Sequence, residues 1–307
     1  MPDLGYRISG FGWLKDYPSI RDYSPQDAVR KLGEGRTYEN IQKVLLPKAE
    51  WAKPADGGLP EAVDNRKWCS PVRDQSSLGS CTAFMATGMY EYMCSRGHSK
   101  YVQLSPLFTY KTTRWLMHVE GDTGAYIRSA IGSLVIYGAP PEEYYPYRID
   151  RFDRIPDTLN TGFAQSFQAL KYFRLDKGIP SDKTLVDRMK EYIYKGFCLG
   201  IGFTVFESYT QADSNGGYIP YPKPNEEVVG GHAVHLVGYT NKGMVNNDDC
   251  FIFKNSWGDK WGDGRGYGYI PTKYFMTQEG MDAPLADDIW CITKYEWLNL
   301  GDFGFNE

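Results

Sequence analysis

A cysteine at the start of an expected helix is the first residue whose surroundings favour chemistry. Cys81 directly follows Gly79-Ser80 and precedes apolar residues at helical spacing. A helix N-terminus presents free N–H groups and a partial positive charge, and both stabilise a thiolate. That stabilisation lowers the thiol pKa and makes the sulfur a nucleophile. Gln75, six residues upstream, carries an amide that can donate to an oxyanion beside this sulfur.

A histidine and an asparagine far along the chain complete a set of residues suited to nucleophilic catalysis. His232 follows Gly230-Gly231, whose lack of side chains leaves space around the imidazole at the start of an expected strand. It lies 151 residues after Cys81, so only the fold can pair the two. Asn255 can accept a hydrogen bond from one imidazole nitrogen and fix the tautomer, and Trp257 can shield that bond from water.

A short segment of small residues offers its backbone to a bound peptide. Residues 121–126 read Gly-Asp-Thr-Gly-Ala-Tyr, and an extended chain can approach such a backbone closely. A bound peptide must satisfy its own N–H and C=O groups. The candidate substrate-binding residues are therefore Gly124, Ala125 and Tyr126, together with Gly231 beside the histidine.

These residues, taken in order, resemble the papain-like family of cysteine peptidases. The segment Leu59-Pro-Glu-Ala-Val-Asp64-Asn-Arg66 is similar to the start of the mature enzyme, and Tyr144-Tyr-Pro-Tyr147 is similar to a landmark of its helical lobe. The resemblance extends from about residue 59 to at least residue 269. It implies a two-lobed α+β fold, in which a helical lobe and a β-barrel-like lobe flank the active-site cleft.

The resemblance also implies the reaction and the residues that perform it. The chain would be an endopeptidase that hydrolyses polypeptides through a thioester acyl-enzyme. Cys81 would be the nucleophile, His232 the base and Asn255 the residue that orients the imidazole. Gln75 and the Cys81 backbone N–H would form the oxyanion hole. No metal or cofactor is implied.

Two cysteines that the resemblance leads us to expect are absent. The family usually has a disulfide between a Cys three residues before the nucleophile and a Cys just before the glycine segment. Here those positions hold Leu78 and Asp122, so both partners are missing together. Thr82 also replaces a usual Trp after the nucleophile. In these departures the sequence resembles bacterial members of the family.

Hydrophobic spacing predicts helices first and strands later. The helices are expected over 81–97, from Ser105-Pro106 onward, over 126–136 and over 183–195. The strands are expected over 198–206, 232–239, 250–254 and 266–270. We therefore divide the chain into an N-terminal arm (1–58), a helical lobe with the nucleophile (59–165) and a β-rich lobe with the histidine and asparagine (166–307).

The N-terminal arm has two interpretations. It is either a structural strap on the back of the domain or a short prosegment that crosses the cleft and acts as an intramolecular inhibitor. We favour the prosegment, because about fifteen extended residues span roughly 50 Å. Residues 11–23, with their aromatics and prolines, would then block the cleft. Two short helices are expected over 25–33 and 37–46.

The composition argues against several other classes of function. Lys plus Arg number 34 against 38 Asp plus Glu, and a net charge of −4 provides no attraction to nucleic acid or anionic membranes. No apolar run long enough to span a bilayer is present, and the N-terminus lacks the apolar region of a secretory signal. The default expectation is a monomer in the cytoplasm, with signal-independent secretion left open. No CxxC pair points to zinc, and the cysteines other than Cys81 are expected to be free thiols.

Two alternative functions stay open. A catalytically silent peptide-binding protein would keep the fold, although every catalytic position is intact, and an amide transferase would pass the same acyl-enzyme to another acceptor. Among the other histidines, His235 is expected to be a packed or surface residue, and His98 and His118 are expected on the surface. Asp248-Asp249 is expected to be a solvated turn rather than a calcium site.

Overall fold

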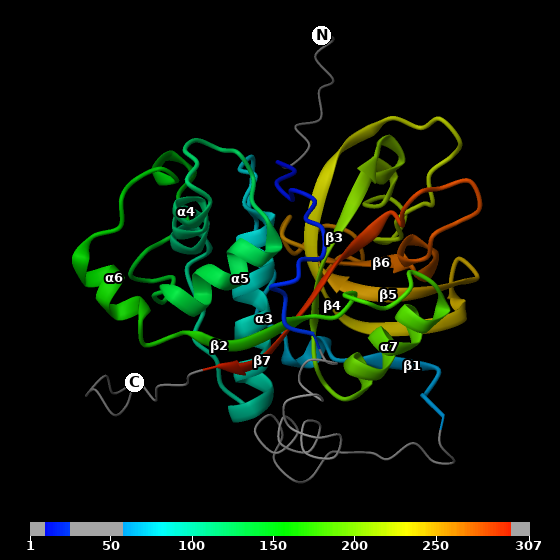
Figure 1. Ribbon diagram of the computed structural model, residues 1–307, viewed down its shortest axis with the longest axis horizontal. Helices are drawn as coiled ribbons and strands as arrows, with labels where there is room; N and C mark the ends of the chain where they lie inside the picture. The colour runs from blue at the N-terminus through cyan, green and yellow to red at the C-terminus, as the bar shows by residue number, and fades with distance from the viewer. Residues whose placement is uncertain (1–9, 25–57, 296–307) are drawn as a thin grey trace.

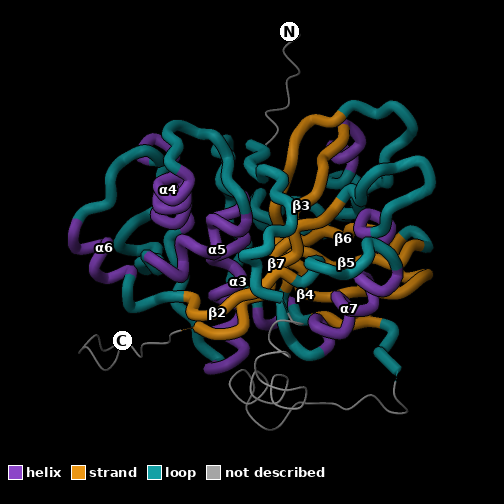
Figure 2. The backbone as a smooth tube through the Cα atoms, viewed as in Figure 1, coloured by secondary structure: helices purple, strands orange, loops and turns teal. Residues whose placement is uncertain are grey.

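The computed structural model describes residues 10–24 and 58–295. Helices of the first half of the chain gather on one side of the molecule and most of the sheet on the other, and residues 10–24 run between them (Figure 1). Helices of the first half precede most strands along the chain. Figure 2 shows most helices and most strands in separate groups, so the predicted α+β arrangement is confirmed. The two helices expected over 25–33 and 37–46 lie outside the described residues.

The central helix, α3 (Cys81–His98), is buried along most of its length. Every residue from Cys81 to Cys94 is buried, because α3 packs against both the neighbouring helices and the long strand β4 (Val228–Val245). The helix ends at His98, because the left-handed φ of 57° at Ser99 stops the α-helical backbone. Its end lies one residue beyond the predicted position.

The remaining helices of this side begin at residues suited to capping. Helix α4 (Pro106–Met117) starts with proline, and Ser105 Oγ accepts a hydrogen bond from the Phe108 N–H. Helix α5 (Ile127–Ile136) confirms the third predicted helix. Helix α6 (Thr158–Ala164), which the sequence pattern did not indicate, is capped by Asp157. Short 3₁₀ helices occupy Arg66–Trp68, Ile149–Arg151, Glu207–Gln211 and Thr272–Phe275.

The described strands form one antiparallel sheet. Its path is β2-β7-β3-β4-β5-β6, with β1 beside β4. The strands other than β4 are β1 (Ala62–Asp64), β2 (Ala169–Arg174), β3 (Leu199–Phe206), β5 (Asp248–Lys254), β6 (Tyr267–Pro271) and β7 (Ala286–Tyr295). No pairing joins β2 to β6 in the described chain, so the barrel-like lobe is corrected to an open sheet. Helix α5 packs against β2, β3 and β7, so it covers this end of the sheet.

Strand β7 is the main element that the sequence pattern missed. It pairs with both β2 and β3 and thereby links the helical side to the rest of the sheet (Figure 1). It begins Ala-Asp-Asp, which is typical of an exposed loop because carboxylates are rarely buried without partners. Its Asp288 is nevertheless fully buried.

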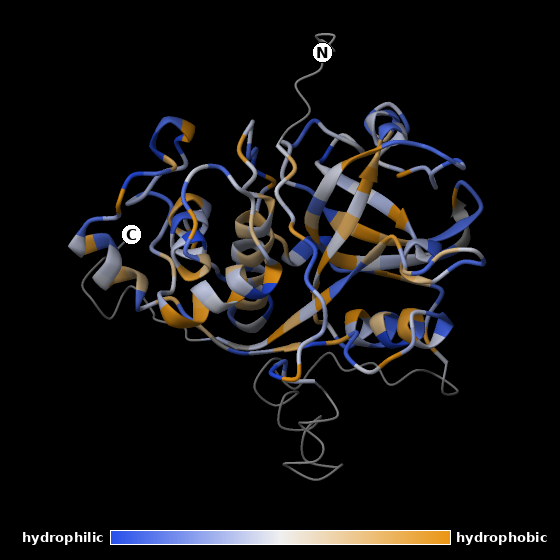
Figure 3. Ribbon diagram, turned by 45° about the horizontal axis from the view of Figure 1, so that its top comes forward, coloured by the Kyte–Doolittle hydropathy of each residue, from blue (hydrophilic) through white to orange (hydrophobic). Residues whose placement is uncertain are grey.

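Helix α7 (Lys183–Tyr194) confirms the amphipathic helix predicted over 183–195. Its buried residues include Leu185, Val186, Met189 and Ile193, which share one face. Lys183 and Asp187 are exposed, and the alternation of apolar and polar residues is visible in Figure 3. The buried face packs against β4, so this helix covers one side of the sheet.

The cysteines do not cross-link this fold. All six lie in the described residues and are free thiols, and five of them are buried. No helix in the described ranges is both long and apolar enough to cross a bilayer.

Candidate active site

Cys81 is the first residue of α3, and its side chain is fully buried. The turn before it is fastened by Ser80, whose Oγ lies 2.7 Å from the Tyr147 Oη. Burial raises the pKa of the Cys81 thiol to about 11, while the backbone N–H groups of Ala233 and Gly12 hydrogen-bond the sulfur and oppose that rise. The cysteine thus stands at a helix N-terminus as predicted, but its thiol is neutral in this conformation.

His232 and Asn255 meet across the paired strands β4 and β5. The His232 Nε2 lies 2.9 Å from the Asn255 Oδ1, which also accepts the Ser256 N–H at 2.9 Å. Because Oδ1 can only accept, Nε2 carries the proton and Nδ1 keeps a lone pair. Nδ1 is buried and has no hydrogen-bond partner among the described residues. Burial lowers the pKa of His232 to about 4, against the effect of the bond to Asn255.

The residue after His232 joins the two halves of the site. The Ala233 N–H, in strand β4, points at the Cys81 sulfur. Helix α3 packs on β4, and this packing brings together residues 151 positions apart. This part of β4 therefore adjoins Cys81, and the role of Cys81, His232 and Asn255 as one catalytic unit stays a prediction.

Aromatic rings surround the imidazole. The ring centroid of Trp257 lies 4.8 Å from that of His232, and Tyr209 lies 5.3 Å from Trp257. Phe11 adds a third ring, 6.1 Å from His232 and 5.8 Å from Trp257. Rings packed in this way keep water from the His232–Asn255 hydrogen bond. The sequence pointed to Trp257, whereas Tyr209 follows β3 at a position with no motif around it.

Gln75 connects the loop before Cys81 to the segment after β5. Its Oε1 accepts from the Ser256 Oγ at 2.5 Å, and its backbone N–H donates to the Ser256 carbonyl at 2.8 Å. Its Nε2 donates to two carbonyls, those of Leu78 and Gly10, each at 2.8 Å. The amide is thus held by Ser256 and aimed at a carbonyl oxygen supplied by the N-terminal arm.

Residues 10–14 of the arm pair with the predicted substrate-binding backbone. The Ala125 N–H donates to the Gly12 carbonyl at 2.7 Å, and the Leu14 N–H donates to the Ala125 carbonyl at 3.0 Å. On the other side, the Trp13 N–H donates to the Gly231 carbonyl at 3.0 Å. The arm is therefore held on both sides, by residue 125 of the helical side and by residue 231 of β4.

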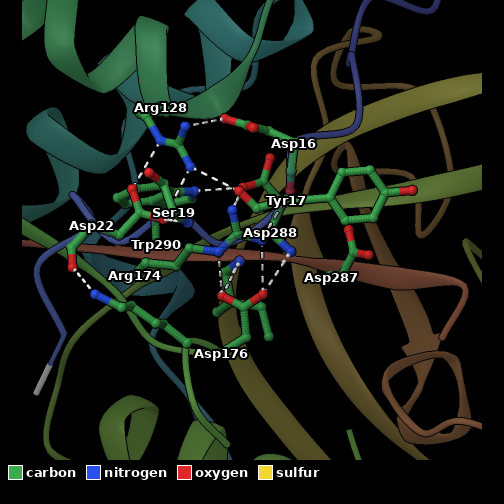
Figure 4. A network of polar contacts seen from close by, with 12 residues as sticks. Asp16, Tyr17, Ser19, Asp22, Arg128, Arg174, Asp176, Asp287, Asp288 and Trp290 are labelled. Carbon is green, nitrogen blue, oxygen red and sulfur yellow. Dashed lines mark hydrogen bonds and ion pairs between the residues drawn. The ribbon is translucent and has the colours of Figure 1, made fainter. Parts of the chain in front are cut away.

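Ion pairs fasten the arm beyond this point. Arg128 of α5 binds Asp16 and Asp22 of the arm, each at 2.9 Å, and Figure 4 shows both carboxylates turned toward its guanidinium. Lys15 of the arm lies 2.7 Å from Asp287 of β7. Through these ion pairs, residues 15–22 of the arm stay bound to the rest of the protein, at α5 and at β7.

Glycine is required where the arm crosses the loop before Cys81. A Cβ on Gly12 would lie 1.8 Å from the Gly79 carbonyl oxygen, and a Cβ on Gly124 would lie 2.5 Å from the Gly12 carbonyl oxygen. Backbone cannot give way as a flexible side chain can, so neither position accommodates a methyl group in this arrangement. The close approach of three backbones depends on glycine at these positions.

The sequence model of the papain family of cysteine proteases matches residues 59–282, which is most of the chain. The chain belongs to the papain family. An uncharacterized peptidase C1-like protein of Acanthamoeba polyphaga mimivirus is 36% identical over 305 residues, covering 97% of this chain and 91% of the relative. Mouse cathepsin K is 26% identical over 260 residues, covering 82% of this chain and 71% of the relative.

Solved structures agree with this assignment. Xylellain, a cysteine protease from Xylella fastidiosa, superposes with a TM-score of 0.69 at 28% identity, covering 92% of this chain and 96% of xylellain. The chain is therefore a papain-like cysteine peptidase, and the papain-like fold is confirmed. The relatives named here come from a virus, an animal and a bacterium, so the bacterial affinity stays a prediction.

Asp122, one of the two positions where the resemblance led us to expect a cysteine, forms a polar clasp. The Asp122 Oδ1 accepts the Gly79 N–H at 2.9 Å and the Tyr110 hydroxyl at 2.5 Å. The Tyr110 Oη in turn accepts the Gly124 N–H at 3.1 Å. Asp122 thus ties the loop before Cys81 to the segment that pairs with the arm, without a covalent bond.

Replacing Asp122 by alanine is expected to lower the free energy of unfolding by about 1 kcal/mol, because two hydrogen bonds to a partly exposed carboxylate are lost. Asp122→Asn is the matched variant, since its amide oxygen can still accept one of the two. Urea denaturation of both variants measures the difference. Equal stability of Asp122→Ala and the parent chain would show that the clasp contributes nothing.

The remaining predicted residues lie at the start of α5, in the core and on the surface. Tyr126 stands directly before α5 with an exposed side chain, apart from the arm backbone contacts of Ala125. His235 is buried against Gly88 of α3 and is thus a packed histidine. His98 and His118 are exposed. Asp248 and Asp249 begin β5, and no cluster suited to a metal ion occurs among the described residues.

Proposed function

We propose that this papain-family chain is an endopeptidase in which Cys81, His232 and Asn255 form the catalytic unit. The observation that carries the proposal is the engagement of His232 Nε2 by Asn255, which leaves Nδ1 as the nitrogen able to exchange a proton. The neighbouring Ala233 N–H reaches the Cys81 sulfur, so this part of β4 adjoins the nucleophile. A base that is oriented by a third group is the arrangement that nucleophilic catalysis requires.

The reaction follows from this arrangement. The Cys81 sulfur, having given its proton to His232 Nδ1, attacks the substrate carbonyl carbon. Gln75 Nε2 and the Cys81 backbone N–H donate to the oxyanion. His232 then protonates the leaving amine, which departs and leaves a thioester on Cys81. Water, deprotonated by His232, attacks the thioester, and the acid is released as the thiol is restored.

Trp257 and the substrate backbone contacts support these steps. Trp257 covers the His232–Asn255 bond and keeps the imidazole oriented. Gly124, Ala125 and Gly231 bind the main chain of the substrate, as Ala125 and Gly231 now bind the arm. We keep Tyr126 as a candidate for contact with a substrate, since its exposed side chain directly follows Ala125.

The arm acts as an intramolecular inhibitor in this proposal. Its Gly10 carbonyl accepts from Gln75 Nε2, the group that would otherwise stabilise the oxyanion. Its Gly12 N–H hydrogen-bonds the Cys81 sulfur, and Phe11 covers the imidazole. A substrate needs these same groups, so the docked arm and a bound substrate exclude one another.

The path of the arm supports an endopeptidase rather than an exopeptidase. The arm is nearest the sulfur at Gly12 and continues in both directions, to the Ser76 carbonyl through Gly10 and to Ala125 through Leu14. The site therefore accommodates main chain on either side of the nucleophile. An exopeptidase would instead close one side and recognise a chain terminus.

The proposed nucleophile is tested with an epoxysuccinyl peptide, which reacts with an activated thiol that can also bind peptide. In a variant whose arm is undocked, we expect one equivalent to attach to Cys81, as located by peptide mass mapping, and the other cysteines to stay unmodified. Lack of reaction at Cys81 in an arm variant that binds peptide would favour a silent peptide-binding protein instead. Ligated product in the presence of an added amine would identify a transferase.

Alkylation of Cys81 is expected to depend on pH in a way that the arm controls. Burial raises the thiol pKa to about 11, so the thiolate forms only as the pH rises toward 11, and iodoacetamide should react slowly at pH 7. A variant whose arm is undocked should react much faster at pH 7, because water reaches the sulfur. Cys198, which is buried directly before β3, serves as the internal control and should stay unreactive in both proteins. Equal rates at Cys81 would contradict inhibition by the arm.

A further inference from the structure

Strand β7 contains a backbone distortion beside the arm. Gly202 of β3 is level with Asp287 and Gly200 is level with Trp290, so β7 has one residue more than β3 over this stretch. Within this bulge Asp288 has a φ of 58°, a left-handed conformation that is unusual for aspartate. Bulges redirect side chains and are frequent next to active sites.

The body of the protein holds this conformation firmly. The Asp288 N–H and the Ile289 N–H both donate to the carboxylate of Asp176, each at 3.2 Å. Arg174 forms ion pairs with Asp176 at 2.9 Å and with Asp288 at 3.1 Å, and Figure 4 shows the guanidinium between the two carboxylates. A strained residue that is fixed by several partners is a candidate for a functional role.

The two oxygens of Asp288 have different partners. Oδ1 accepts the Trp290 indole N–H at 2.7 Å and faces Arg174, and both of these belong to the body. Oδ2 accepts the indole N–H of Trp13 at 3.1 Å, and Trp13 belongs to the arm. When the arm leaves, Oδ2 loses this donor while the partners of Oδ1 stay in place. A buried acceptor without a hydrogen-bond donor is unfavourable, so Oδ2 favours a ligand that supplies a new donor.

Two glycines make room for the Trp13 ring. A Cβ on Gly202 would lie 2.0 Å from Trp13 Cε2, and a Cβ on Gly231 would lie 2.8 Å from Trp13 Cε3. With Asp288 they define a space that we call the Trp13 pocket. The ring is 7% exposed, so the pocket encloses it. Any other residue at position 202 or 231 would exclude a ring of this size.

The Trp13 pocket opens on the track that we propose for substrate. The Trp13 N–H pairs with Gly231, and its neighbours Gly12 and Leu14 pair with Ala125. A substrate held by the same backbone groups would therefore place a side chain in this pocket once the arm has left.

We propose that Asp288 is a specificity-determining residue, and that the Trp13 pocket selects substrates with a large flat side chain bearing a neutral N–H donor, above all tryptophan. The inference rests on the proposed function and adds a substrate class to it. A neutral donor is favoured over a cation because Arg174 already compensates the Asp288 carboxylate. The pocket thus offers a carboxylate oxygen that accepts a hydrogen bond and whose negative charge is already paired with Arg174.

The test uses the full chain carrying Gly12→Ala and Trp13→Ala, which together undock the arm and empty the pocket. Fluorogenic peptides carry either tryptophan or 3-benzothienylalanine at each position on the N-terminal side of the scissile bond. The two side chains have nearly the same shape, but sulfur replaces the N–H in the second. Assays at pH 8 keep the carboxylate ionised, since burial raises the pKa of Asp288 to about 7.

We expect kcat/KM to be at least about tenfold higher for tryptophan than for its analogue at one position, and not at the others. Asp288→Ala should remove this preference, whereas Asp288→Asn, whose amide oxygen can accept, should keep part of it. The preference is a ratio within one protein, so partial unfolding of a variant does not alter it. Thermal melting identifies a variant that fails to fold. In that case the inference is judged by the ratio of kcat/KM values for the two peptides in the chain that carries only Gly12→Ala and Trp13→Ala.

Several results would overturn the inference. Equal kcat/KM values for the two peptides at every position would show that the pocket does not recognise the indole N–H. A preference that survives Asp288→Ala would assign the selection to another group, and a preference for Lys or Arg over Trp would contradict the neutral donor. In each case hydrolysis itself leaves the proposed function intact. Absence of hydrolysis of any peptide, together with an unreactive Cys81, would overturn both.

Discussion

Gly12→Ala is expected to raise kcat/KM for a small fluorogenic peptide by roughly tenfold or more. The added Cβ would lie 1.8 Å from the Gly79 carbonyl oxygen, a backbone atom, so the arm must lift at this point. Overpacking of this kind typically costs about 1–3 kcal/mol, and each 1.4 kcal/mol shifts the balance between docked and open arms about tenfold. Initial rates at several substrate concentrations measure the change.

Gly58→Ala is the matched control for this substitution. It makes the same chemical change just before the body of the domain, and no atom lies within 4 Å of the added Cβ. Its activity should equal that of the parent chain. If Gly12→Ala and Gly58→Ala both leave kcat/KM unchanged while the parent enzyme is active, the arm does not limit access to Cys81.

Cys81→Ala is expected to lower kcat/KM by at least about a thousandfold, because no acyl-enzyme can form without the sulfur. The measurement is made in the Gly12→Ala background, where the arm does not mask the loss. Alanine is a better helix former than cysteine and removes only one heavy atom from the start of α3, so the melting temperature should change little.

Cys69→Ala is the matched control for the nucleophile. It also removes one thiol, from the residue that follows the 3₁₀ helix Arg66–Trp68, and should leave activity near that of the Gly12→Ala protein. Substantial hydrolysis by Cys81→Ala, or an equal loss in both variants, would refute the role of Cys81.

Local sequence was sufficient to locate much of the helical side. Ser105-Pro106 predicted the start of α4, because a serine oxygen can cap the first turn and proline needs no N–H there. The apolar spacing after Ser80 predicted α3 to within one residue of its end. Such signals act within one helical turn, so they do not depend on the rest of the fold.

Strand β7 and the open sheet could not be predicted in this way. Judged by hydrophobic pattern alone, the two adjacent carboxylates at positions 287 and 288 indicate an exposed loop and not a buried strand. The burial of Asp288 is favourable because its carboxylate has partners in Arg174, Trp290 and Trp13. Arg174 and Trp13 are distant in the sequence, and Trp290 lies in the strand that was not predicted. Barrel closure likewise depends on how strands far apart in sequence pair, which their residue types leave undetermined.

The sequence by itself determined which residue types are available for chemistry and where along the chain they occur. Cys81 at a helix start, His232 after two glycines and Asn255 before Ser-Trp-Gly are all legible without coordinates. The resemblance to the family also implied that Leu78 and Asp122 stand where a disulfide is usual, but it did not indicate that Asp122 forms a polar clasp. These are properties of short segments, whose chemistry follows from neighbours in the chain.

Only the tertiary structure decided how these residues meet and what covers them. The packing of α3 on β4 brings the Ala233 N–H to the Cys81 sulfur, and the arm places Gly10 on Gln75 and Trp13 on Asp288. The physical reason is that burial and hydrogen bonding between distant segments set the protonation of each group. The same thiol that a helix N-terminus would activate is neutral beneath the arm, because desolvation there exceeds the stabilisation that the backbone N–H groups provide.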